Sequence, residues 1–396
     1  MTQANPSAAP SAASPAKPSL ELLRSLTDEH VLRALMQARR LTRADLAART
    51  GLSKPTVGES VRRLTEAGLL LDTGERTPGG RGRGRVGSYF ALAGKAGSAL
   101  VASIAPDGVV AESVDAFGDT MASAQEAITR PARPAQVTEA LRAAVAQARR
   151  GAGQAARLAV VSAADPVQRG SGRLVHLSDS PFLLGDLNPA EVLAPQVKGP
   201  VIVDNDVNWA ARAEREHGGA GRLDDFAYVF LGEGLGCAIV SDGEVSRGHA
   251  GLAGEIAHLI TVGPHGQATR LIEVFGELRL RQAGSTAIDA GRLLSVTAGQ
   301  DAQAAGTRHA LGQAISGVLA AIVALADPGL VIIGGSWGRH PVVMQAISSA
   351  FAGLPRHVPV RAAELTDQPS LAGARSDAVR RLRSAIVAAA HPSHPA

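Results

Sequence analysis

The sequence contains one cysteine, Cys237, and no uninterrupted apolar run of about 18 residues. A lone cysteine excludes a disulfide within the chain and a metal site built from several cysteines. A membrane-spanning helix needs about 18 to 20 apolar residues in succession, so no membrane span is expected. Residues 1–19 are mostly Pro, Ala and Ser and lack the continuous apolar segment of a signal peptide. We therefore expect a disordered tail over residues 1–19 and, as the simplest location, the cytoplasm.

The sequence does contain enough apolar material for large cores, and its charge is unevenly distributed. The chain has 396 residues, 45% of them apolar, which favours two or three globular domains. The net charge of the whole chain is +4. Residues 1–97 contain 15 basic and 8 acidic residues, a net charge of +7, whereas the remaining residues contain 25 basic and 28 acidic residues, a net charge of −3. The excess of positive charge in the first quarter indicates a polyanionic partner for that part alone.

Three short helices are predicted in residues 27–67. Thr27, Thr42 and Ser53 each precede a helical pattern and can cap it, and Pro55 suits the first turn of the third helix. Gly51 ends the second helix, and only about four residues join it to the third, which is helix-turn-helix spacing. The residues expected in the core of this bundle are Val31, Leu32, Leu35, Met36, Leu46, Ala47, Val57, Val61 and Leu64.

The third predicted helix carries polar residues at its N-terminal end and arginines further on, which suits contacts with DNA bases and phosphates. A strand, a glycine-rich turn and a second strand follow it, with "RGRGR" at the tip, as in the wing of a winged helix. Alternatively, the helices merely pack and the arginines solvate a loop. Together with the local charge, the pattern predicts a winged helix-turn-helix over residues 20–92 that binds double-stranded DNA. The predicted DNA-binding residues are Thr42, Ser53, Lys54, Pro55, Thr56, Ser60, Arg62, Arg63, Arg81, Arg83 and Arg85.

Residues 93–389 alternate strands with alanine-rich helices, which is typical of an α/β fold, and residues 390–396 are expected to be a tail. The pattern predicts a hairpin at Asp107-Gly108, a helix over 137–151 and a buried strand over 155–167. A strand, polar turn and helix are expected in 200–219, and two strands around a glycine turn in 224–248. A long apolar helix should begin at about Ala310 and be followed by a strand that ends at Gly334-Gly335.

Three segments resemble the ROK family, in this order behind a winged helix. They are "VIVDNDVNWAARAE" (201–214), "GEGLGCAIVSDGEVSRGHAGLAGEIAHL" (232–259) and "DPGLVIIGGS" (327–336). That family joins sugar kinases and sugar-responsive repressors. The resemblance implies an N-terminal winged helix-turn-helix followed by a two-lobed, actin/hexokinase-like α/β domain that binds an effector and supports oligomerisation.

The same resemblance implies an effector site. Asn205 and Asp206 match residues that bind the sugar and its hydroxyl in family kinases, and Glu255 and His258 match further sugar contacts. Glu273 matches a glutamate that binds sugar in relatives, with Glu277 as the alternative. Without the resemblance, each of these residues also has a purely structural explanation. Asn205 and Asp206 fit a strand-end turn that caps the next helix, Glu255 fits an ordinary solvent-exposed glutamate, and His258 fits a histidine whose hydrogen bonds are made within the protein. "GEGLG" (232–236) corresponds to a phosphate-binding turn, which is a weak signal alone.

Two departures from the family pattern bear on function. The kinases carry an Asp-x-Gly-x-Thr turn that holds ATP phosphates, whereas this chain has "LAGKAGSALVASIAPDGVV" there. Positioned phosphates are central to phosphoryl transfer, so we expect no enzyme activity and no cofactor. The family's His-Cys₃ zinc site is replaced by "HLITVGPHGQATRLIEVFGE", which has no cysteine, so we expect no metal. Leu271, Ile272, Val274 and Phe275 should pack in the core instead.

These observations predict a DNA-binding transcriptional regulator, a repressor, that responds to a sugar or sugar derivative. A helix-turn-helix covers half a palindromic operator, which favours a homodimer or homotetramer. Two alternatives remain open: a sugar kinase with an added DNA-binding domain, and a DNA-binding regulator that has lost sugar sensing.

Overall fold

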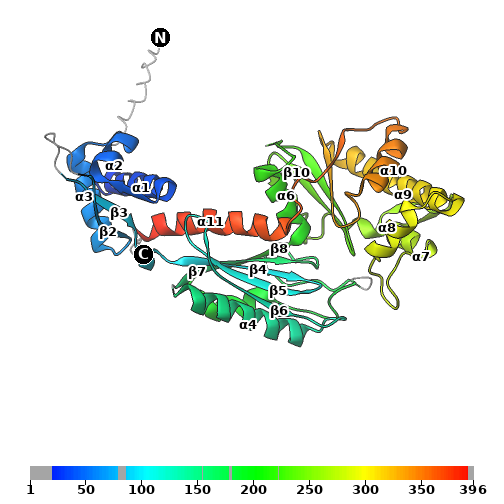
Figure 1. Ribbon diagram of the computed structural model, residues 1–396, viewed down its shortest axis with the longest axis horizontal. Coiled ribbons are helices and arrows are strands. Elements are labelled where there is room, and N and C mark those ends of the chain that lie inside the picture. The colour runs from blue at the N-terminus through cyan, green and yellow to red at the C-terminus, as the bar shows by residue number, and fades with distance from the viewer. Residues whose placement is uncertain (1–19, 79–85, 154, 178–180, 222, 391–396) are drawn as a thin grey trace, which may run out of the picture. The chain divides into compact units, whose positions relative to one another are not determined.

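The computed structural model describes residues 20–78, 86–153, 155–177, 181–221 and 223–390 (Figure 1). It divides into two compact units, one of residues up to Ala96 together with those from Ala385 onward, and one of Gly97–Ser384. The predicted tail of residues 1–19 lies outside the described residues, as does the predicted tail from position 391.

The first unit is a helical bundle beside a small sheet. It contains α1 (Leu20–Ala38), β1 (Arg40–Thr42), α2 (Arg43–Thr50), α3 (Lys54–Glu66), β2 (Leu70–Arg76), β3 (Ser88–Leu92) and the 3-10 helix η1 (Gly94–Ala96). The three strands pair antiparallel in the order β1-β3-β2. The predicted apolar stripes are confirmed for eight of the nine residues, because Val31, Leu32, Leu35, Met36, Leu46, Val57, Val61 and Leu64 are all buried, whereas Ala47 is only half-buried.

The helix boundaries in this unit follow the predicted caps in two cases out of three. Thr42 forms a capping box with Asp45, Gly51 ends α2 with φ +71°, and Ser53 caps α3. The predicted cap at Thr27 is wrong, because α1 begins at Leu20 and the Thr27 hydroxyl donates to the carbonyl of Leu23 within the helix. The preceding "LELLRSL" consists mainly of good helix formers, which carry the helix further back than Thr27.

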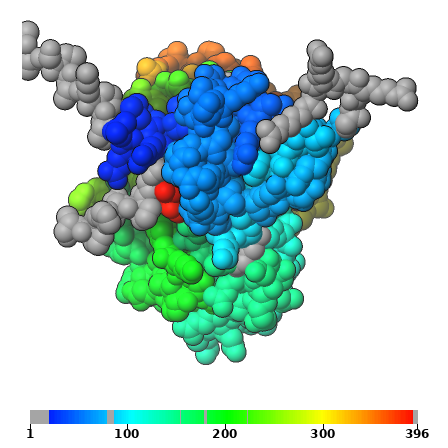
Figure 2. All heavy atoms as spheres, turned by 90° about the vertical axis from the view of Figure 1, so that its left-hand side faces the viewer, coloured from blue at the N-terminus to red at the C-terminus, as the bar shows by residue number. Residues whose placement is uncertain are grey.

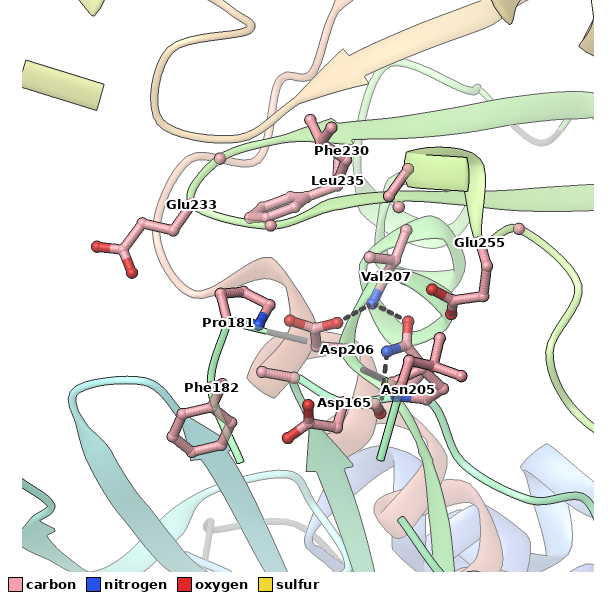
Figure 3. A pocket seen from close by; sticks show the side chains of 18 of the residues that line it. Asp165, Pro181, Phe182, Asn205, Asp206, Val207, Phe230, Glu233, Leu235 and Glu255 are labelled. Carbon is pink, nitrogen blue, oxygen red and sulfur yellow. Dashed lines mark hydrogen bonds between the residues drawn. The ribbon is translucent and has the colours of Figure 1, made fainter. Parts of the chain in front are cut away.

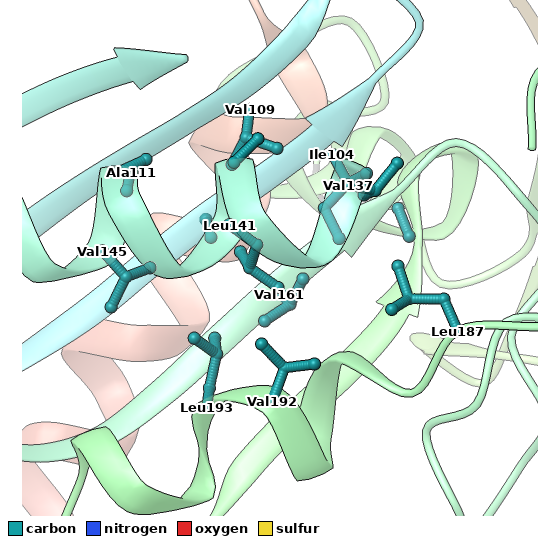
Figure 4. Packing of buried hydrophobic residues seen from close by; sticks show 14 of the residues in the cluster. Ile104, Val109, Ala111, Val137, Leu141, Val145, Val161, Leu187, Val192 and Leu193 are labelled. Atoms are coloured by element: carbon teal, nitrogen blue, oxygen red, sulfur yellow. The ribbon is translucent and has the colours of Figure 1, made fainter. Parts of the chain in front are cut away.

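The second unit begins with a five-stranded lobe. Its elements are β4 (Ser98–Ala105), β5 (Gly108–Val114), β6 (Thr120–Ala127), α4 (Pro134–Ala152), β7 (Ala156–Ala163), α5 (Pro189–Leu193), η2 (Ala194–Gln196) and β8 (Val201–Asn205). The sheet has the order β6-β5-β4-β7-β8, with β4, β7 and β8 parallel. One side of α4 buries Val137, Leu141 and Val145 in a cluster with Ile104 and Val161 (Figure 4). The predicted hairpin at Asp107-Gly108 is confirmed, since Ala105 pairs with Gly108.

A second five-stranded lobe follows α6 (Asp206–His217). It contains β9 (Phe226–Leu231), β10 (Leu235–Ser241), β11 (Glu244–Val245), η3 (Ile256–His258), β12 (Ile260–Val262), β13 (Ala268–Arg270), α7 (Leu271–Glu277), α8 (Ala290–Ala298), α9 (Ala302–Ala326), β14 (Val331–Gly334), α10 (Pro341–Ala352) and β15 (Val360–Ala362). Its sheet has the order β11-β10-β9-β14-β15, with β9, β14 and β15 parallel.

The two lobes share one topology. Numbered within each lobe, both sheets have the strand order 3-2-1-4-5, with two antiparallel strands on one side of the first strand and two parallel strands on the other. Helix α11 (Pro369–Ala389) covers the face of the first sheet opposite α4 (Figure 1), where Arg375 makes a bidentate ion pair with Glu112 at 2.8 Å. This repeated arrangement confirms the predicted two-lobed α/β domain.

Helix α9 has the length and composition of a membrane-spanning helix, with a mean hydropathy of 1.7. More than half of that apolar window, 56%, is buried inside the protein. Leu311, Ile315, Leu319 and Ile322 of α9 belong to the core cluster of the second lobe. Helix α9 is therefore buried as the core helix of a globular domain is, and a helix buried in this way also needs an apolar composition.

Candidate functional site

A cavity of about 350 Å³ lies in the second unit, lined by residues of both lobes (Figure 3). This volume falls within the range of about 300–1,000 Å³ usual for small-molecule sites. The first lobe contributes the ends of β7 and β8, where parallel strands place their carboxyl termini at one sheet edge. The second lobe contributes the turn between β9 and β10 and the segment that contains Gly254, Glu255 and His258.

Asn205 and Asp206 line this cavity at the point where β8 becomes α6. The Asn205 side-chain oxygen accepts from the Val207 backbone N–H at 3.0 Å and thereby caps α6. Its amide nitrogen donates to the carbonyls of Ala163 and Asp165 at 3.3 and 3.2 Å. Asn205 therefore caps α6, as the structural alternative raised by the sequence has it, and because Asn205 also lines the cavity its contact with an effector stays a prediction.

Asp165 is a cavity residue that the sequence analysis missed. It follows β7 by two positions, and its side chain is 1% exposed. Because Ala163 of β7 is in register with Asn205 of β8, Asp165 and Asp206 emerge from neighbouring strands at the same edge (Figure 3). The available signal was a carboxylate directly after an apolar strand, the same signal that marked Asp206.

Glu255 reaches the cavity from the second lobe. Its position depends on Gly254, which has φ +100° and packs so closely that an added Cβ would lie 1.8 Å from the Cys237 carbonyl oxygen. Only glycine fits this approach. Within the described residues, the Glu255 carboxylate has neither a hydrogen bond nor an ion pair. His258, at the end of η3, lines the same cavity.

The loop that carries Glu255 is also tied to the first lobe. The buried carboxylate of Asp204, at the end of β8, pairs with Arg212 of α6 at 2.9 Å and with Arg247 of the loop at 3.2 Å. The Arg169 backbone N–H donates to the Ala250 carbonyl at 2.9 Å. These contacts hold the Glu255 loop against the strand ends of the other lobe.

The predicted effector contacts at Glu273 and Glu277 are wrong in their placement. Helix α7 directs Ile272 toward the cavity, and the next residue, Glu273, points elsewhere and pairs with Arg270 at 2.8 Å and Arg281 at 3.2 Å. Glu277 accepts from Gln267 at 2.7 Å and does not line the cavity. The ion pairs with Arg270 and Arg281 hold the Glu273 carboxylate away from the cavity that Ile272 lines.

Burial perturbs two of the cavity's carboxyl groups. The pKa of Asp206 is raised to about 7, first by burial and then by the charge of Asp165. The pKa of Glu255 is also raised to about 7, by burial and by the charges of Asp206 and Asp165. Asp206 and Glu255 therefore interact electrostatically with Asp165 across one space, and part of the negative charge of Asp206 and Glu255 is suppressed near neutral pH.

At the mouth of the cavity, one arginine bridges the two lobes. Arg130 donates to Glu233 of the β9–β10 turn at 2.6 Å, to Asp107 of the β4–β5 turn, and to the Pro106 carbonyl at 3.2 Å. Glu233 belongs to the "GEGLG" turn that the resemblance assigned to phosphate. The Arg130 guanidinium offsets part of the negative charge of the Glu233 and Asp107 carboxylates, and the negative charge that remains at these two turns disfavours phosphate.

The segment that replaces the family's cysteine motif folds as a hairpin. Strands β12 and β13 pair antiparallel, Thr261 donates to the Ala314 carbonyl of α9 at 2.6 Å, and α7 follows directly. The predicted packing of Leu271, Ile272, Val274 and Phe275 is confirmed, since all four are buried.

In the first unit, drawn in blue in Figure 2, the N-terminal end of α3 is open to solvent. Ser53, Lys54, Pro55 and Thr56 are all exposed, and the Ser53 hydroxyl lies 2.7 Å from that of Thr56. The predicted wing strands are present as β2 and β3, but Arg81, Arg83 and Arg85 lie outside the described residues. The exposed arginines of α2, Arg43 and Arg49, were not singled out from sequence.

Three of the predicted DNA contacts are placed differently from expectation. Ser60 is fully buried, and its hydroxyl donates to Asp28 at 2.5 Å, so its assignment to the open face of α3 is wrong. Arg63 is 24% exposed and donates to the same carboxylate at 2.6 and 3.2 Å. Thr42 is 3% exposed because its hydroxyl forms the cap of α2. Arg62 is exposed as predicted, and it pairs with Glu59 and Glu66.

Comparison with known proteins agrees with both units. Residues 110–270 match the ROK family, and residues 24–70 match the winged helix-turn-helix DNA-binding family. A glucokinase of Halalkalibacterium halodurans is 45% identical over 76 residues, which are 19% of this chain and 23% of the glucokinase. A xylose repressor of Caldicellulosiruptor bescii is 42% identical over 59 residues, 15% of either chain. The chain thus spans less than a quarter of these two relatives.

Among solved structures, a ROK family transcriptional regulator, a homologue of the Escherichia coli MLC protein, covers 92% of this chain and 99% of its own length. Its TM-score is 0.63 at 17% identity, so the likeness concerns the fold. The family matches identify residues 110–270 as a ROK family segment that is joined, in one chain, to a winged helix-turn-helix segment at residues 24–70.

Proposed function

We propose that the protein is a transcriptional repressor that binds a palindromic operator as a homodimer or homotetramer and responds to a sugar or sugar derivative. The observation that carries the proposal is the combination of two sites in one chain. The N-terminal end of α3 is exposed in a winged helix-turn-helix, and a cavity lined by Asp206, Glu255 and His258 lies between two lobes.

On the DNA side, the exposed end of α3 supports direct base contacts by Lys54 and Thr56. The exposed Arg43 and Arg49 of α2 suit phosphate contacts, and Arg81, Arg83 and Arg85 would extend these into the adjacent minor groove. Asp28, Ser60 and Arg63 instead hold α3 against α1, so they act on DNA only through the position of α3.

On the effector side, hydroxyl groups of a sugar would bond to carboxylates from both lobes. A ligand that bridges the lobes changes the angle between them, and an oligomer converts that change into a different spacing of its two DNA-binding units. A tenfold change in operator affinity needs a differential affinity of only about 1.4 kcal/mol between the two states. Two hydrogen bonds of about 1 kcal/mol each suffice for this.

Sugar kinase activity is the competing function, since a glucokinase is among the relatives. The charge at the cavity mouth argues against it, because Glu233 and Asp107 occupy the turns that would face the phosphates and Arg130 offsets only part of their negative charge. A coupled assay with ATP and common hexoses and N-acetylhexosamines tests this directly. Turnover above about 1 s⁻¹, an ordinary enzymatic rate, would establish the kinase.

The regulator function is tested with the full-length protein. Operator sequences are first selected from a random duplex library, and effectors are then identified as sugars that change operator affinity. Asp206→Ala and Glu255→Ala should bind the operator as the wild type does but lose the response to the effector. Glu244→Gln, at an exposed residue of β11, is the matched control and should respond normally. A normal response in both cavity variants would show that the effector binds elsewhere.

A further inference from the structure

Helix α3 of the DNA-binding unit presents an acidic side chain, Glu59, on the face that points away from the bundle. The residues that α3 buries in the bundle are Val57, Ser60, Val61 and Leu64. At 3.6 residues per turn, Pro55, Glu59 and Arg62 lie on the opposite side of the helix. The Glu59 side chain is 52% exposed, and an added Cβ at the neighbouring Gly58 would meet no atom within 4 Å. This turn of α3 is therefore accessible to a groove of DNA.

Glu59 also lies in the part of α3 that reads bases in a helix-turn-helix. In such units the N-terminal residues of the second helix contact the base edges. Helix α3 begins at Lys54, so Glu59 is in its second turn. Glu66, the last residue of α3, lies about 10 Å further along the helix axis, at 1.5 Å per residue. Of these two exposed glutamates, Glu59 is the one that a base can reach.

The Glu59 carboxylate is held in place by Arg62. The Arg62 guanidinium donates to both carboxylate oxygens of Glu59, at 2.6 and 3.2 Å, and to Glu66 at 2.8 Å. The hydrogen bond from Arg62 lowers the pKa of Glu59, so this group is ionised at neutral pH and only accepts hydrogen bonds. The positive charge of Arg62 also offsets the repulsion between the Glu59 carboxylate and DNA phosphates.

Helix stability alone does not account for this acid. Exposed ion pairs along a helix contribute little to stability, and Arg62 already forms one with Glu66 at the favourable spacing of four residues. A second acid on the side that would face DNA adds repulsion by the phosphates. This repulsion is offset where the acid accepts a hydrogen bond from a base.

The chemistry of a carboxylate restricts which base this is. In the major groove, the amino groups of cytosine and adenine are the hydrogen-bond donors. Adenine presents its N7 acceptor beside the amino group, and this acceptor repels a carboxylate. Adenine therefore suits glutamine or asparagine, whose amides donate and accept at once. Cytosine presents its N4 amino group without an acceptor of its own in this groove, so an ionised carboxylate favours cytosine.

We propose that Glu59 specifies one cytosine in each half-site of the operator by accepting a hydrogen bond from the N4 amino group, and that Arg62 is the positioning residue for this carboxylate. The inference rests on the proposed function, because it takes α3 as the helix that reads DNA. It adds to the expected contacts of Lys54 and Thr56 a defined base at a defined residue.

The test repeats the operator selection from a random duplex library with full-length wild type, Glu59→Ala and Glu59→Gln. The wild type should prefer cytosine at one position of each half-site by about tenfold over the other bases. Glu59→Ala should lose this preference at that position alone, and Glu59→Gln should change it to adenine. Glu66→Gln removes an acid that pairs with the same arginine, and as the matched control it should select the wild-type sequence.

A modified operator supplies a readout on the wild type itself. In a duplex, N4-methylcytosine carries a methyl group in place of the N4 hydrogen that faces the major groove. At the selected position it should weaken binding of the wild type by about tenfold and leave binding of Glu59→Ala unchanged. Arg62→Ala should lower the preference for cytosine severalfold, and Arg62→Lys should restore part of it. An unchanged preference in Arg62→Ala would refute the positioning role, since a residue that only stabilises the helix does not alter base choice.

The outcomes separate this inference from the proposed function. If the wild type selects an operator but Glu59→Ala selects the same sequence with the same preferences, the assignment of cytosine to Glu59 is overturned and the regulator function stands. Indifference of the wild type to N4-methylcytosine at every cytosine of the operator overturns the assignment as well. If the wild type selects no sequence from the library, the regulator function fails and this inference fails with it.

Discussion

Replacing Asp28 by alanine should loosen the DNA-binding unit without affecting the effector domain. The Asp28 carboxylate is 1% exposed and accepts from the Ser60 hydroxyl at 2.5 Å and from the Arg63 guanidinium at 2.6 and 3.2 Å. These are contacts between α1 and α3 across more than 30 positions of sequence. Asp28 therefore fixes the recognition helix on the bundle.

The cost of this substitution has two parts. It leaves the buried Ser60 hydroxyl without its acceptor, which costs about 1–3 kcal/mol. It also leaves Arg63 without its partner, and removing one member of a buried pair costs about 3–5 kcal/mol. Because Arg63 is 24% exposed and can turn toward water, its share is well below that range. The better helix propensity of alanine returns about 0.5 kcal/mol, so the expected net loss is about 2–4 kcal/mol.

Hydrogen exchange on the full-length protein measures this loss where it occurs. At about 1.4 kcal/mol per factor of ten, amides of α1 and α3 that exchange by opening of the unit should exchange about 30- to 700-fold faster. Amides of α4, in the other unit, serve as the internal reference and should be unchanged. Operator affinity should fall in parallel, since α3 is no longer held in one position.

Two controls define the result. Ser60→Ala keeps the Asp28–Arg63 pair and should accelerate exchange by less than about tenfold, for the loss of one hydrogen bond of about 1 kcal/mol. Glu29→Ala breaks a surface ion pair with Arg33, whose side chain is 64% exposed, and should have almost no effect. Exchange in α3 that is unchanged in Asp28→Ala would refute the role assigned to this carboxylate.

Three further predictions concern the wing and the cavity. Replacing Arg81, Arg83 and Arg85 by alanine should reduce the slope of log operator affinity against log salt concentration by up to about 2.7, at about 0.9 per phosphate contact, and should leave the melting temperature unchanged. An unaltered slope would mean that these arginines do not contact DNA. Gly254→Ala should abolish the effector response but keep operator binding, because the added Cβ would lie 1.8 Å from the Cys237 carbonyl oxygen and displace Glu255. Gly266→Ala is the control and should respond normally, since an added Cβ there has no atom within 4 Å. A carboxyl group whose pKa rises to about 7 on folding destabilises the folded protein as pH rises from about 4 to 7. The melting temperature of the free protein should therefore fall over this pH window, and it should fall by less in the double variant Asp206→Asn/Glu255→Gln. Equal slopes of melting temperature against pH in the two proteins would contradict the raised pKa values of both groups.

Several features of this protein are determined by short stretches of sequence. The caps at Thr42 and Ser53, the αL glycine at position 51 and the hairpin at Asp107-Gly108 occur as predicted, because their partners lie within four residues. The apolar stripe of α3 depends on helical periodicity alone. Local sequence therefore suffices for the helix-turn-helix, the alternation of strands and helices, and the strand-end position of Asp206.

The identity of the cavity's third acid was decided by tertiary structure. Sequence offered Glu273, but α7 turns Ile272 toward the cavity, and Arg281 holds Glu273 away from it. Asp165 takes part instead, because β7 and β8 are parallel neighbours in register, a pairing that no local pattern encodes. Arg130 and Glu233 meet across 103 positions of sequence, and Ser60 is buried because Asp28 lies opposite it on α1. Such contacts depend on which faces of distant elements meet, and that is settled only when the whole chain packs.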